Sequence, residues 1–358
     1  MRLLAPLATL AVGVAAPAAR ADTIYLTDGS LISDCTVTDE TLATVGYRLD
    51  KDKSEVPSEK VLRVEFERKP ELVREADAEV GEKNYSDAIA IFEDFLKGFA
   101  EKPSRKHPWA PAYAMYRVLE VNGIMGKADA MVAAADRVIA SAPDSRYLPL
   151  AYLKKAEALA AQDKGGSALG VLKEFEGVID GKGLAERWKH ECRLDAVLHD
   201  AKLTGEGRIK ALEKVSEDTA GTYPVVHNRA EVAIAETYLE TKKIADAQKI
   251  FEAISADPQA DDRTLAAAYT GLGECQFNQG AGSKDQKLLG EALKNFMRVA
   301  VVHKDELRYA PKAMYYAGRV YDLVEDEEGK ARAQKLYARA YMGYRGSPWA
   351  DEAKKYLR

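Results

Sequence analysis

The stretch between positions 190 and 199 holds five side chains of the types that bind metals or exchange protons. They are His190, Glu191, Cys192, Asp195 and His199. The two histidines are nine positions apart, which places them on opposite sides of a helix with about 3.6 residues per turn, so they cannot hold one ion. Glu191 and Asp195 share a face of that helix, but acidic side chains on a helix are more typical of a solvated surface. The sequence therefore predicts no metal site here.

The rest of the chain carries no motif of catalysis or cofactor binding. It contains no nucleophile elbow, Walker loop, dinucleotide fingerprint or metalloprotease helix. The glycine clusters at 165–166 and 280–282 follow predicted helices rather than strands, and therefore indicate turns between helices. The three cysteines, at positions 35, 192 and 275, are far apart and odd in number, so we expect buried apolar residues rather than a disulfide framework. The sequence predicts a protein that is not an enzyme and needs no cofactor.

The net charge argues against two classes of partner. The 358 residues include 57 acidic and 52 basic side chains, a net charge of −5, and 47% of the residues are hydrophobic. Without Arg2 and Arg20, which belong to the segment discussed next, the net charge is −7. An acidic chain with no basic cluster is a poor binder of nucleic acid or of an anionic membrane surface.

The first 21 residues predict export. Arg2 gives a positive start, Leu3–Ala16 is an apolar run, and Ala19-Arg20-Ala21 fits the small residues that precede a cleavage site. The run is too short to span a membrane well, and it is interrupted by proline and glycine. We therefore expect a signal peptide over 1–21 and a mature chain in the periplasm, or secreted, with no integral membrane segment.

A small β module is expected over residues 22–70. Short alternating strands are predicted at 23–26, 31–37, 42–47 and 61–66, with a hairpin turn at Asp28-Gly29 and a charged turn at 50–53. Four or five short strands in so few residues predict a small, strongly bent barrel. The layout resembles the SH3-like or Sm-like barrels near the start of some exported bacterial proteins. Sm-like barrels bind RNA, but export and acidity favour an interaction or spacer module.

Beyond residue 70 the strand signals end and amphipathic helices follow in pairs. We expect about seven pairs over 71–346 and a short capping helix over 347–358, which starts with Ser347 as N-cap and Pro348 in the first turn. The apolar face of the last helix, with Trp349, Ala353 and Tyr356, would cover the open end of the stack. The fold class is mainly α, an α-solenoid that follows a β-barrel-like module.

Residues 228–261 give the repeat its clearest form. Two helices meet at a polar break over 240–243, with small residues where they cross and bulky apolar residues beside them. Residues 156–175 match the spacing without gaps, and the pairs built on Gly273 with Phe296 and on Gly318 with Tyr337 match after insertions. This pattern resembles the tetratricopeptide repeat (TPR) family, although the repeats here are longer than the ~34 residues of the ideal unit. Helix starts such as PDSRYLPLAYLKKAEAL, from Pro143, resemble those of bacterial envelope repeat proteins.

The resemblance implies protein or peptide binding on the concave face, which the first helix of each pair lines. The outward positions carried over by register form the predicted groove: Glu157, Arg229, Glu236, Thr270, Glu274, Lys312, Tyr315 and Arg319. Seven of the 18 tyrosines fall between 309 and 344. They are expected either to pack with their hydroxyl groups exposed to solvent or to line this groove. The implied function is an interaction scaffold of the bacterial cell envelope.

Three other functions remain open. A structural protein could assemble through copies of the same chain, and oligomerisation is compatible with every feature above. A cell-wall-acting enzyme would need a catalytic domain that the sequence does not display. Nucleic-acid binding through the barrel would require salt-sensitive affinity, which an acidic chain does not predict.

Overall fold

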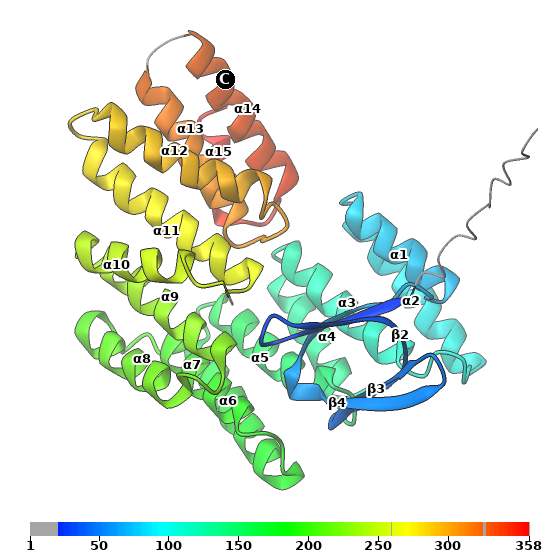
Figure 1. Cartoon of the computed structure of the whole chain (residues 1–358). Helices are drawn as coiled ribbons and strands as arrows, with labels where there is room; N and C mark the ends of the chain where they lie inside the picture. Colours follow the sequence, from blue (N-terminus) through cyan, green and yellow to red (C-terminus); the bar gives the residue numbers. More distant parts are fainter. Residues whose placement is uncertain (1–20, 259, 325–326, 358) are drawn as a thin grey trace, which may run out of the picture.

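The computed structural model describes residues 21–258, 260–324 and 327–357. The described residues are mainly helical and begin with a small antiparallel sheet (Figure 1). The predicted signal peptide lies outside the described residues, apart from Ala21. Among the residues described, no helix is both long and apolar enough to cross a membrane.

The sheet module, residues 22–65, has five strands in the order β4-β3-β2-β1-β5. The elements are β1 (Asp22–Leu26), β2 (Leu31–Glu40), β3 (Thr44–Leu49), β4 (Asp52–Pro57), the 3-10 turn η1 (Ser58–Lys60) and β5 (Val61–Glu65). The predicted alternation is confirmed in β1, β2 and β3, where Ile24, Cys35, Val37 and Val45 face the core. The sheet is open, with β4 and β5 at its two edges, so the small bent barrel expected from the sequence is not closed.

Strand β4 is absent from the predicted strands because it has almost no alternation to read. Only Val56 of its side chains is buried, and its first residues were expected to form a charged turn. It pairs with β3 from Leu49↔Asp52 to Thr44↔Pro57. Charged side chains and a proline are tolerated there because an edge strand leaves one row of its backbone groups unpaired.

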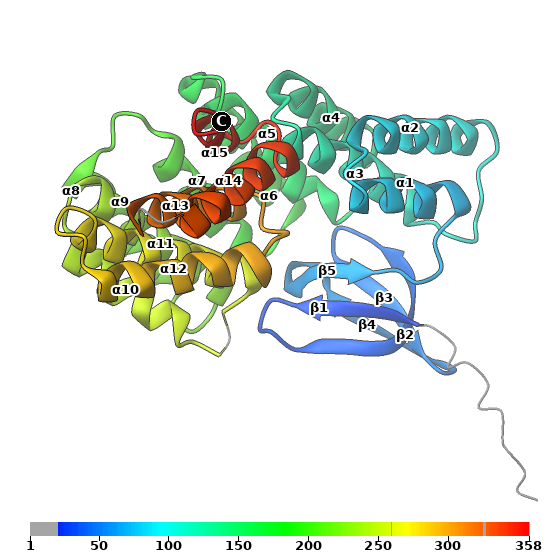
Figure 2. The same ribbon diagram turned by 90° about the horizontal axis from the view of Figure 1, so that it is seen from above.

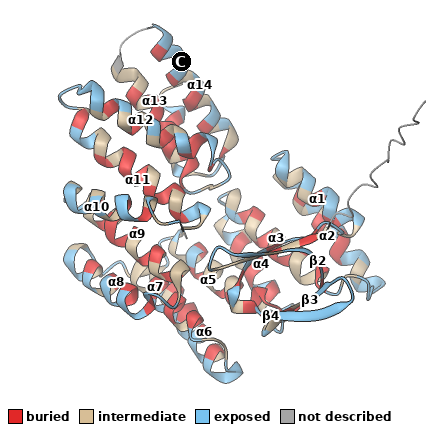
Figure 3. Ribbon diagram, viewed as in Figure 1, coloured by how far each residue is buried: buried red, intermediate tan, exposed pale blue. Residues whose placement is uncertain are grey.

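Seven pairs of helices and a terminal helix follow the sheet, and together they form the helical array (residues 71–357). The pairs are α1 (Glu71–Gly81) with α2 (Tyr85–Glu101), α3 (Ala110–Ile124) with α4 (Ala128–Ser141), α5 (Tyr147–Ala160) with α6 (Gly165–Lys182), α7 (Arg187–His199) with α8 (Gly205–Thr219), α9 (Pro224–Glu240) with α10 (Ile244–Ser255), α11 (Asp262–Gly280) with α12 (Gln286–Val301), and α13 (Ala310–Val324) with α14 (Glu327–Gly343); the last helix is α15 (Pro348–Lys354). Buried residues follow the faces where successive helices meet (Figure 3).

Glycines at helix crossings explain why these pairs pack closely. A Cβ added at Gly273 of α11 would lie 2.5 Å from the ring of Phe296 of α12, and one at Gly318 of α13 would lie 2.5 Å from the ring of Tyr337 of α14. The aromatic ring on the second helix therefore occupies the space that a side chain on the first would need. This is the pairing of small and bulky residues expected from the repeat pattern.

The terminal helix α15 packs as a cap on the last pair. The Ser347 hydroxyl accepts a hydrogen bond from the Trp349 backbone N–H, as expected for the N-cap. The Trp349 ring lies 5.4 Å from that of Tyr315, and the Tyr356 ring lies 5.1 Å from that of Tyr337. Most of the late tyrosines therefore serve packing, which is one of the two roles expected for them.

The array curves far enough for its end to touch its beginning. A Cβ at Gly126, in the α3–α4 turn, would lie 2.9 Å from the carbonyl oxygen of Gly346, and one at Gly346 would lie 2.5 Å from that of Met125. Nearby, Lys83 Nζ in the α1–α2 turn donates to the carbonyl of Gly343 at 3.4 Å. The α1–α2 turn and the α3–α4 turn therefore contact the end of α14 and the segment that leads to α15. The array thus forms a closed curve rather than an open arc.

The sheet module packs on the array through a common core. Phe66, just after β5, stacks on Trp109 with ring centroids 3.5 Å apart. At the end of β2, the Glu40 carboxylate accepts hydrogen bonds from Arg146 Nε and from the Tyr147 hydroxyl, the latter at 2.7 Å. The Glu40 side chain is 0% exposed and that of Arg146 is 6% exposed. A buried pair of this kind fixes one relative position of its two elements.

Candidate functional site: a pocket between the sheet and the array

The module and the array together enclose a pocket of about 590 Å³. The sheet contributes the β1–β2 hairpin and β5, and the array contributes residues of α5, α7 and α9, the start of α11, Tyr116 of α3 and Glu306 before α13. Figure 2 shows the sheet on one side of the array, beside α1 and α3. The concave surface expected from the sequence is therefore partly covered by the chain's own sheet module.

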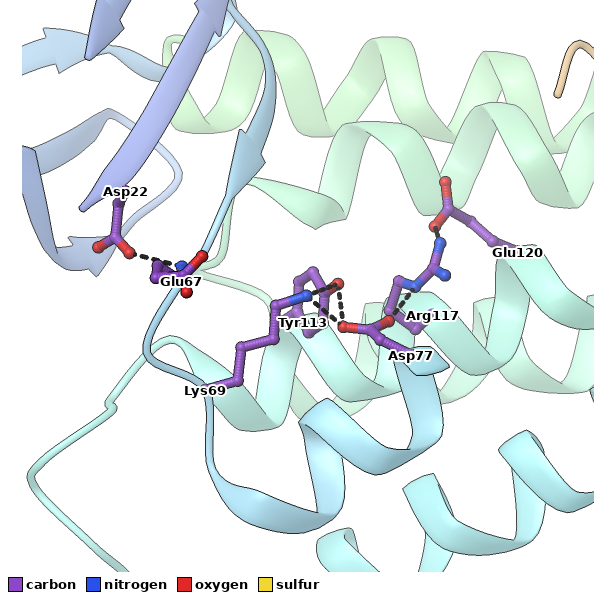
Figure 4. A network of polar contacts seen from close by, with 7 residues as sticks. All are labelled: Asp22, Glu67, Lys69, Asp77, Tyr113, Arg117 and Glu120. Atoms are coloured by element: carbon purple, nitrogen blue, oxygen red, sulfur yellow. Dashed lines mark hydrogen bonds and ion pairs between the residues drawn. The ribbon is translucent and has the colours of Figure 1, made fainter. Parts of the chain in front are cut away.

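A polar network holds the linker between the sheet and the array (Figure 4). The Asp22 carboxylate accepts from the Val37 N–H at 2.8 Å and from the Glu67 N–H at 2.9 Å, so it ties β2 to the linker. Asp77 of α1 pairs with Lys69 at 2.5 Å and with Arg117 Nε of α3 at 3.0 Å.

Burial raises the pKa of the Tyr113 hydroxyl well above its usual range; nearby Arg117 opposes that shift and Asp77 adds to it. The neutral hydroxyl donates to Asp77 at 2.8 Å. The network is fully paired and contacts the sheet at its first residue, so its role is to position the module.

A second cluster forms the wall of the pocket between α7 and α9. Arg229 pairs with Glu191 and, at 2.7 Å, with Asp195; Arg187 lies 3.4 Å from Glu191 and also donates to the carbonyl of Glu59 in η1. Glu191 and Asp195 are buried, so the expectation that they form a solvated face was wrong. Burial raises the pKa of Asp195, and the neighbouring Arg229 guanidinium opposes that shift. Arg187 connects this cluster to the sheet module.

Glu157 of α5 lies inside the pocket with half of its side chain exposed. Its carboxylate pairs with Lys154 at 2.7 Å. The Lys154 ammonium lowers the pKa of Glu157 to about 2, against a smaller opposing effect of burial, and Arg263 and Arg308 contribute in the same direction as the lysine. Several cations from different helices therefore act on one carboxylate, because the curvature of the array brings them together.

The remaining residues of the predicted groove lie in four different environments. Glu236 pairs with Arg308 at 3.1 Å beside Arg229, where a second pocket of only about 40 Å³ opens. Glu274 and Lys312 form a largely buried pair at 2.5 Å, and burial raises the pKa of Glu274 although Lys312 opposes the shift.

Thr270 does not reach the surface. Its side chain is buried, and its hydroxyl donates to the Ala266 carbonyl within α11 at 2.7 Å. Tyr315 is also buried, and Arg319 donates to its hydroxyl at 3.0 Å, beside the cap formed by α15. Of the predicted set, the structure therefore brings Glu157 and Arg229 together in the large pocket and places Arg229 with Glu236 in the small one.

Sequence reasoning missed the half of the pocket that the sheet supplies. Tyr25, Leu62 and Arg63 line it, with the Arg63 guanidinium 3.6 Å from the centroid of the Tyr25 ring. It also missed Asp262 and Glu306, which precede or begin helices on the opposite side. The only sequence signal for that side is Asp261, whose side chain caps α11 by accepting from the Thr264 N–H.

The described part of the chain shows no set of three or more His, Cys, Asp or Glu side chains placed to hold a metal ion. All three cysteines are free and buried, as the sequence predicts. Burial raises the pKa of the Cys35 thiol to about 11, which leaves it protonated at neutral pH. The residues that line the pocket carry charged, hydrogen-bonding and apolar side chains.

The chain was compared with protein families, curated proteins and solved structures. No family model matches the sequence, and a search of curated proteins finds no match. Among solved structures, the chain is similar to the C-terminal part of a TPR repeat-containing protein from Cytophaga hutchinsonii, with 16% identity, coverage of 80% of this chain and 99% of that chain, and a TM-score of 0.35.

Proposed function

We propose that this protein is a non-enzymatic protein–protein interaction scaffold of the bacterial cell envelope, with a solenoid of the TPR type. It holds a segment of a partner protein in the pocket between the sheet module and the helical array. The observation that carries this proposal is the pocket itself, which is lined from both parts of the chain. Its volume of about 590 Å³ falls within the ~300–1,000 Å³ of pockets that enclose a ligand.

The lining supports recognition of a polypeptide rather than chemistry on a substrate. Leucines from both sides, Leu26 and Leu62 of the sheet and Leu150 and Leu153 of α5, give the pocket an apolar part. Charged groups held in ion pairs lie around it, and fixed charges of this kind give specificity and orientation more than bulk affinity. Because Arg229 of α9 is paired with Glu191 and Asp195 of α7, and Arg187 donates to the sheet module, this wall of the pocket is formed before a segment binds.

The location rests on the sequence. The positive, apolar and small-residue pattern of 1–21 supports export, and the helix starts at Pro143 and Gly346 are of the kind expected in envelope repeat proteins. Cell fractionation with N-terminal sequencing tests this part. A periplasmic chain that starts at Asp22 is expected, and a cytoplasmic chain that retains residues 1–21 would contradict it.

Photo-crosslinking from inside the pocket tests the binding itself. The full chain would carry benzoylphenylalanine at Leu153, which lines the pocket, or at Glu213, which is exposed on α8 and does not line it. After irradiation of the producing cells, we expect a defined cross-linked protein from position 153 that is absent from position 213. Identical products from both positions, or none from position 153, would contradict the proposal.

A further inference from the structure

One side of the pocket has more acidic than basic side chains. Its lining includes five basic side chains (Arg63, Lys154, Arg187, Arg229 and Arg263) and six acidic ones (Glu157, Glu191, Asp195, Asp261, Asp262 and Glu306). Most of these are held in pairs: Lys154 with Glu157, Arg187 and Arg229 with Glu191 and Asp195, and Arg63 with Glu65 outside the lining. What remains is one guanidinium, Arg263, against the three carboxylates Asp261, Asp262 and Glu306.

These three carboxylates form one wall of the pocket, which we call the acidic wall. Asp261 uses one oxygen to cap α11, where it accepts from the Thr264 N–H at 2.7 Å. Glu306 has no ion-pair partner within 4 Å among the residues described, and burial, then Asp261 and Asp262, raise its pKa against the opposing effect of Arg263. Adjacent like charges with one cation among them leave the wall with an excess of negative potential.

Asp262 is the most accessible member of the wall. Its side chain is 79% exposed, and its only neighbour of basic type within ion-pair distance in the described chain is His303, with Nδ1 3.4 Å away. The His303 ring is buried, and Nδ1 makes no hydrogen bond among the described residues. Asp262 therefore keeps its hydrogen-bonding capacity for a group that enters from the pocket.

The sheet and α5 also contribute apolar surface to the same pocket. Leu26 and Leu62 of the sheet and Leu150 and Leu153 of α5 line it, and Leu62 is 38% exposed. An occupant that covers both sides needs apolar surface at one end and a positive charge at the other. Lysine and arginine side chains combine an apolar stem with a cationic head, so a segment that carries one of them next to an apolar residue fits both sides.

We propose that the pocket binds an extended segment of another protein in which an apolar residue packs between the sheet and α5 and a nearby lysine or arginine binds the acidic wall. This inference rests on the proposed function and adds the chemistry of the partner. The protein itself is acidic, with a net charge of −5, which also favours the approach of a basic segment.

A peptide selection tests the inference without a known partner. A displayed library of random twelve-residue peptides would be selected on the full chain. Binders that fail on a Leu153→Trp variant, in which the larger side chain narrows the pocket beside α5, would be assigned to the pocket. Their affinities would then be measured on Asp262→Asn/Glu306→Gln and on a control, Glu213→Gln/Glu217→Gln. The control removes the same charge from α8, where both glutamates are exposed and neither lines the pocket.

The outcomes separate the inference from the proposed function. We expect pocket-dependent peptides to be enriched in Lys or Arg beside apolar residues, and to lose about tenfold in affinity on the acidic-wall variant but less than about twofold on the control. Raising the salt concentration should weaken binding to the unaltered chain. Pocket-dependent peptides that are neutral or acidic, or that bind both variants equally, would overturn the inference and leave the proposed function standing. A selection that yields no pocket-dependent peptide would overturn both.

Discussion

Replacement of Gly126 by alanine tests whether the helical array is closed. Gly126 has a φ of +66°, in the left-handed region, and the backbone of Gly346 lies against it. An added Cβ would lie 2.9 Å from the Gly346 carbonyl oxygen, closer than a real Cβ approaches, so one of the two segments must move. The matched control is Gly183, whose φ is +63° but which has nothing within 4 Å of an added Cβ.

The difference in stability between Gly126→Ala and Gly183→Ala measures the effect of the contact between Gly126 and Gly346. In both variants the free energy of unfolding should fall by about 1–2 kcal/mol because alanine is strained at positive φ. Only Gly126→Ala adds a steric clash, for which overpacking in a folded protein costs roughly 1–3 kcal/mol. The expected loss is therefore about 2–5 kcal/mol at position 126 and about 1–2 kcal/mol at position 183.

Urea unfolding measures the two losses, and small-angle scattering measures the shape. A larger side chain, in Gly126→Leu, should also increase the radius of gyration because the end of the array must separate from its beginning. Gly183→Leu should not change it. Equal losses of stability at the two positions, within about 0.5 kcal/mol, and equal radii would refute the closed arrangement.

Three further outcomes follow from the contacts described. Arg146→Met leaves the Glu40 carboxylate buried without its cation, so the free energy of unfolding should fall by about 3–5 kcal/mol; a loss below about 1 kcal/mol in a urea titration would contradict that role. Lys154→Met removes the main cause of the low pKa of Glu157, so the pKa should rise from about 2 toward 4.5 in an NMR titration. Because the folded-state pKa is lowered, the stability that Glu157 contributes is present above about pH 4.5 and is lost as the pH falls toward 2, and the lysine variant should lose that dependence; an unchanged titration would contradict the assignment. The three thiols should react with an alkylating reagent at pH 8 only after unfolding, because all are buried; rapid reaction of the native chain would contradict their burial.

Much of the fold could be predicted because the helices repeat one pattern. Small residues such as Gly273 and Gly318 meet bulky ones such as Phe296 at a fixed spacing, and that spacing reflects a local contact between consecutive helices. Strand β4 could not be predicted, because its exposed, charged side chains carry no periodic signal. Closure of the array could not be predicted either, since it depends on Gly126 and Gly346, which are far apart in the sequence and are each ordinary turn glycines.

The candidate site was only partly predictable for a related reason. Glu157 and Arg229, which were predicted from the register of the first helix in each pair, line the pocket in the structure. The same register predicted that Tyr315 lines the groove. In the structure its ring is buried beside Trp349, because the terminal helix covers that face. Variants at Tyr315 would therefore test packing of the cap and not binding. The contribution of the sheet, through residues such as Leu62, depends on how the module docks, which no local pattern encodes.

The most direct test of the central claim is the affinity of a partner segment for the pocket. The segment cross-linked from position 153 would be synthesised and titrated by calorimetry into the full chain and into Leu153→Trp, after urea unfolding has shown similar stability for both. The account predicts a loss of at least about tenfold in affinity when the larger side chain at position 153 obstructs the pocket between the sheet and α5. Equal affinity for the two chains would show that the segment binds elsewhere and would contradict the account.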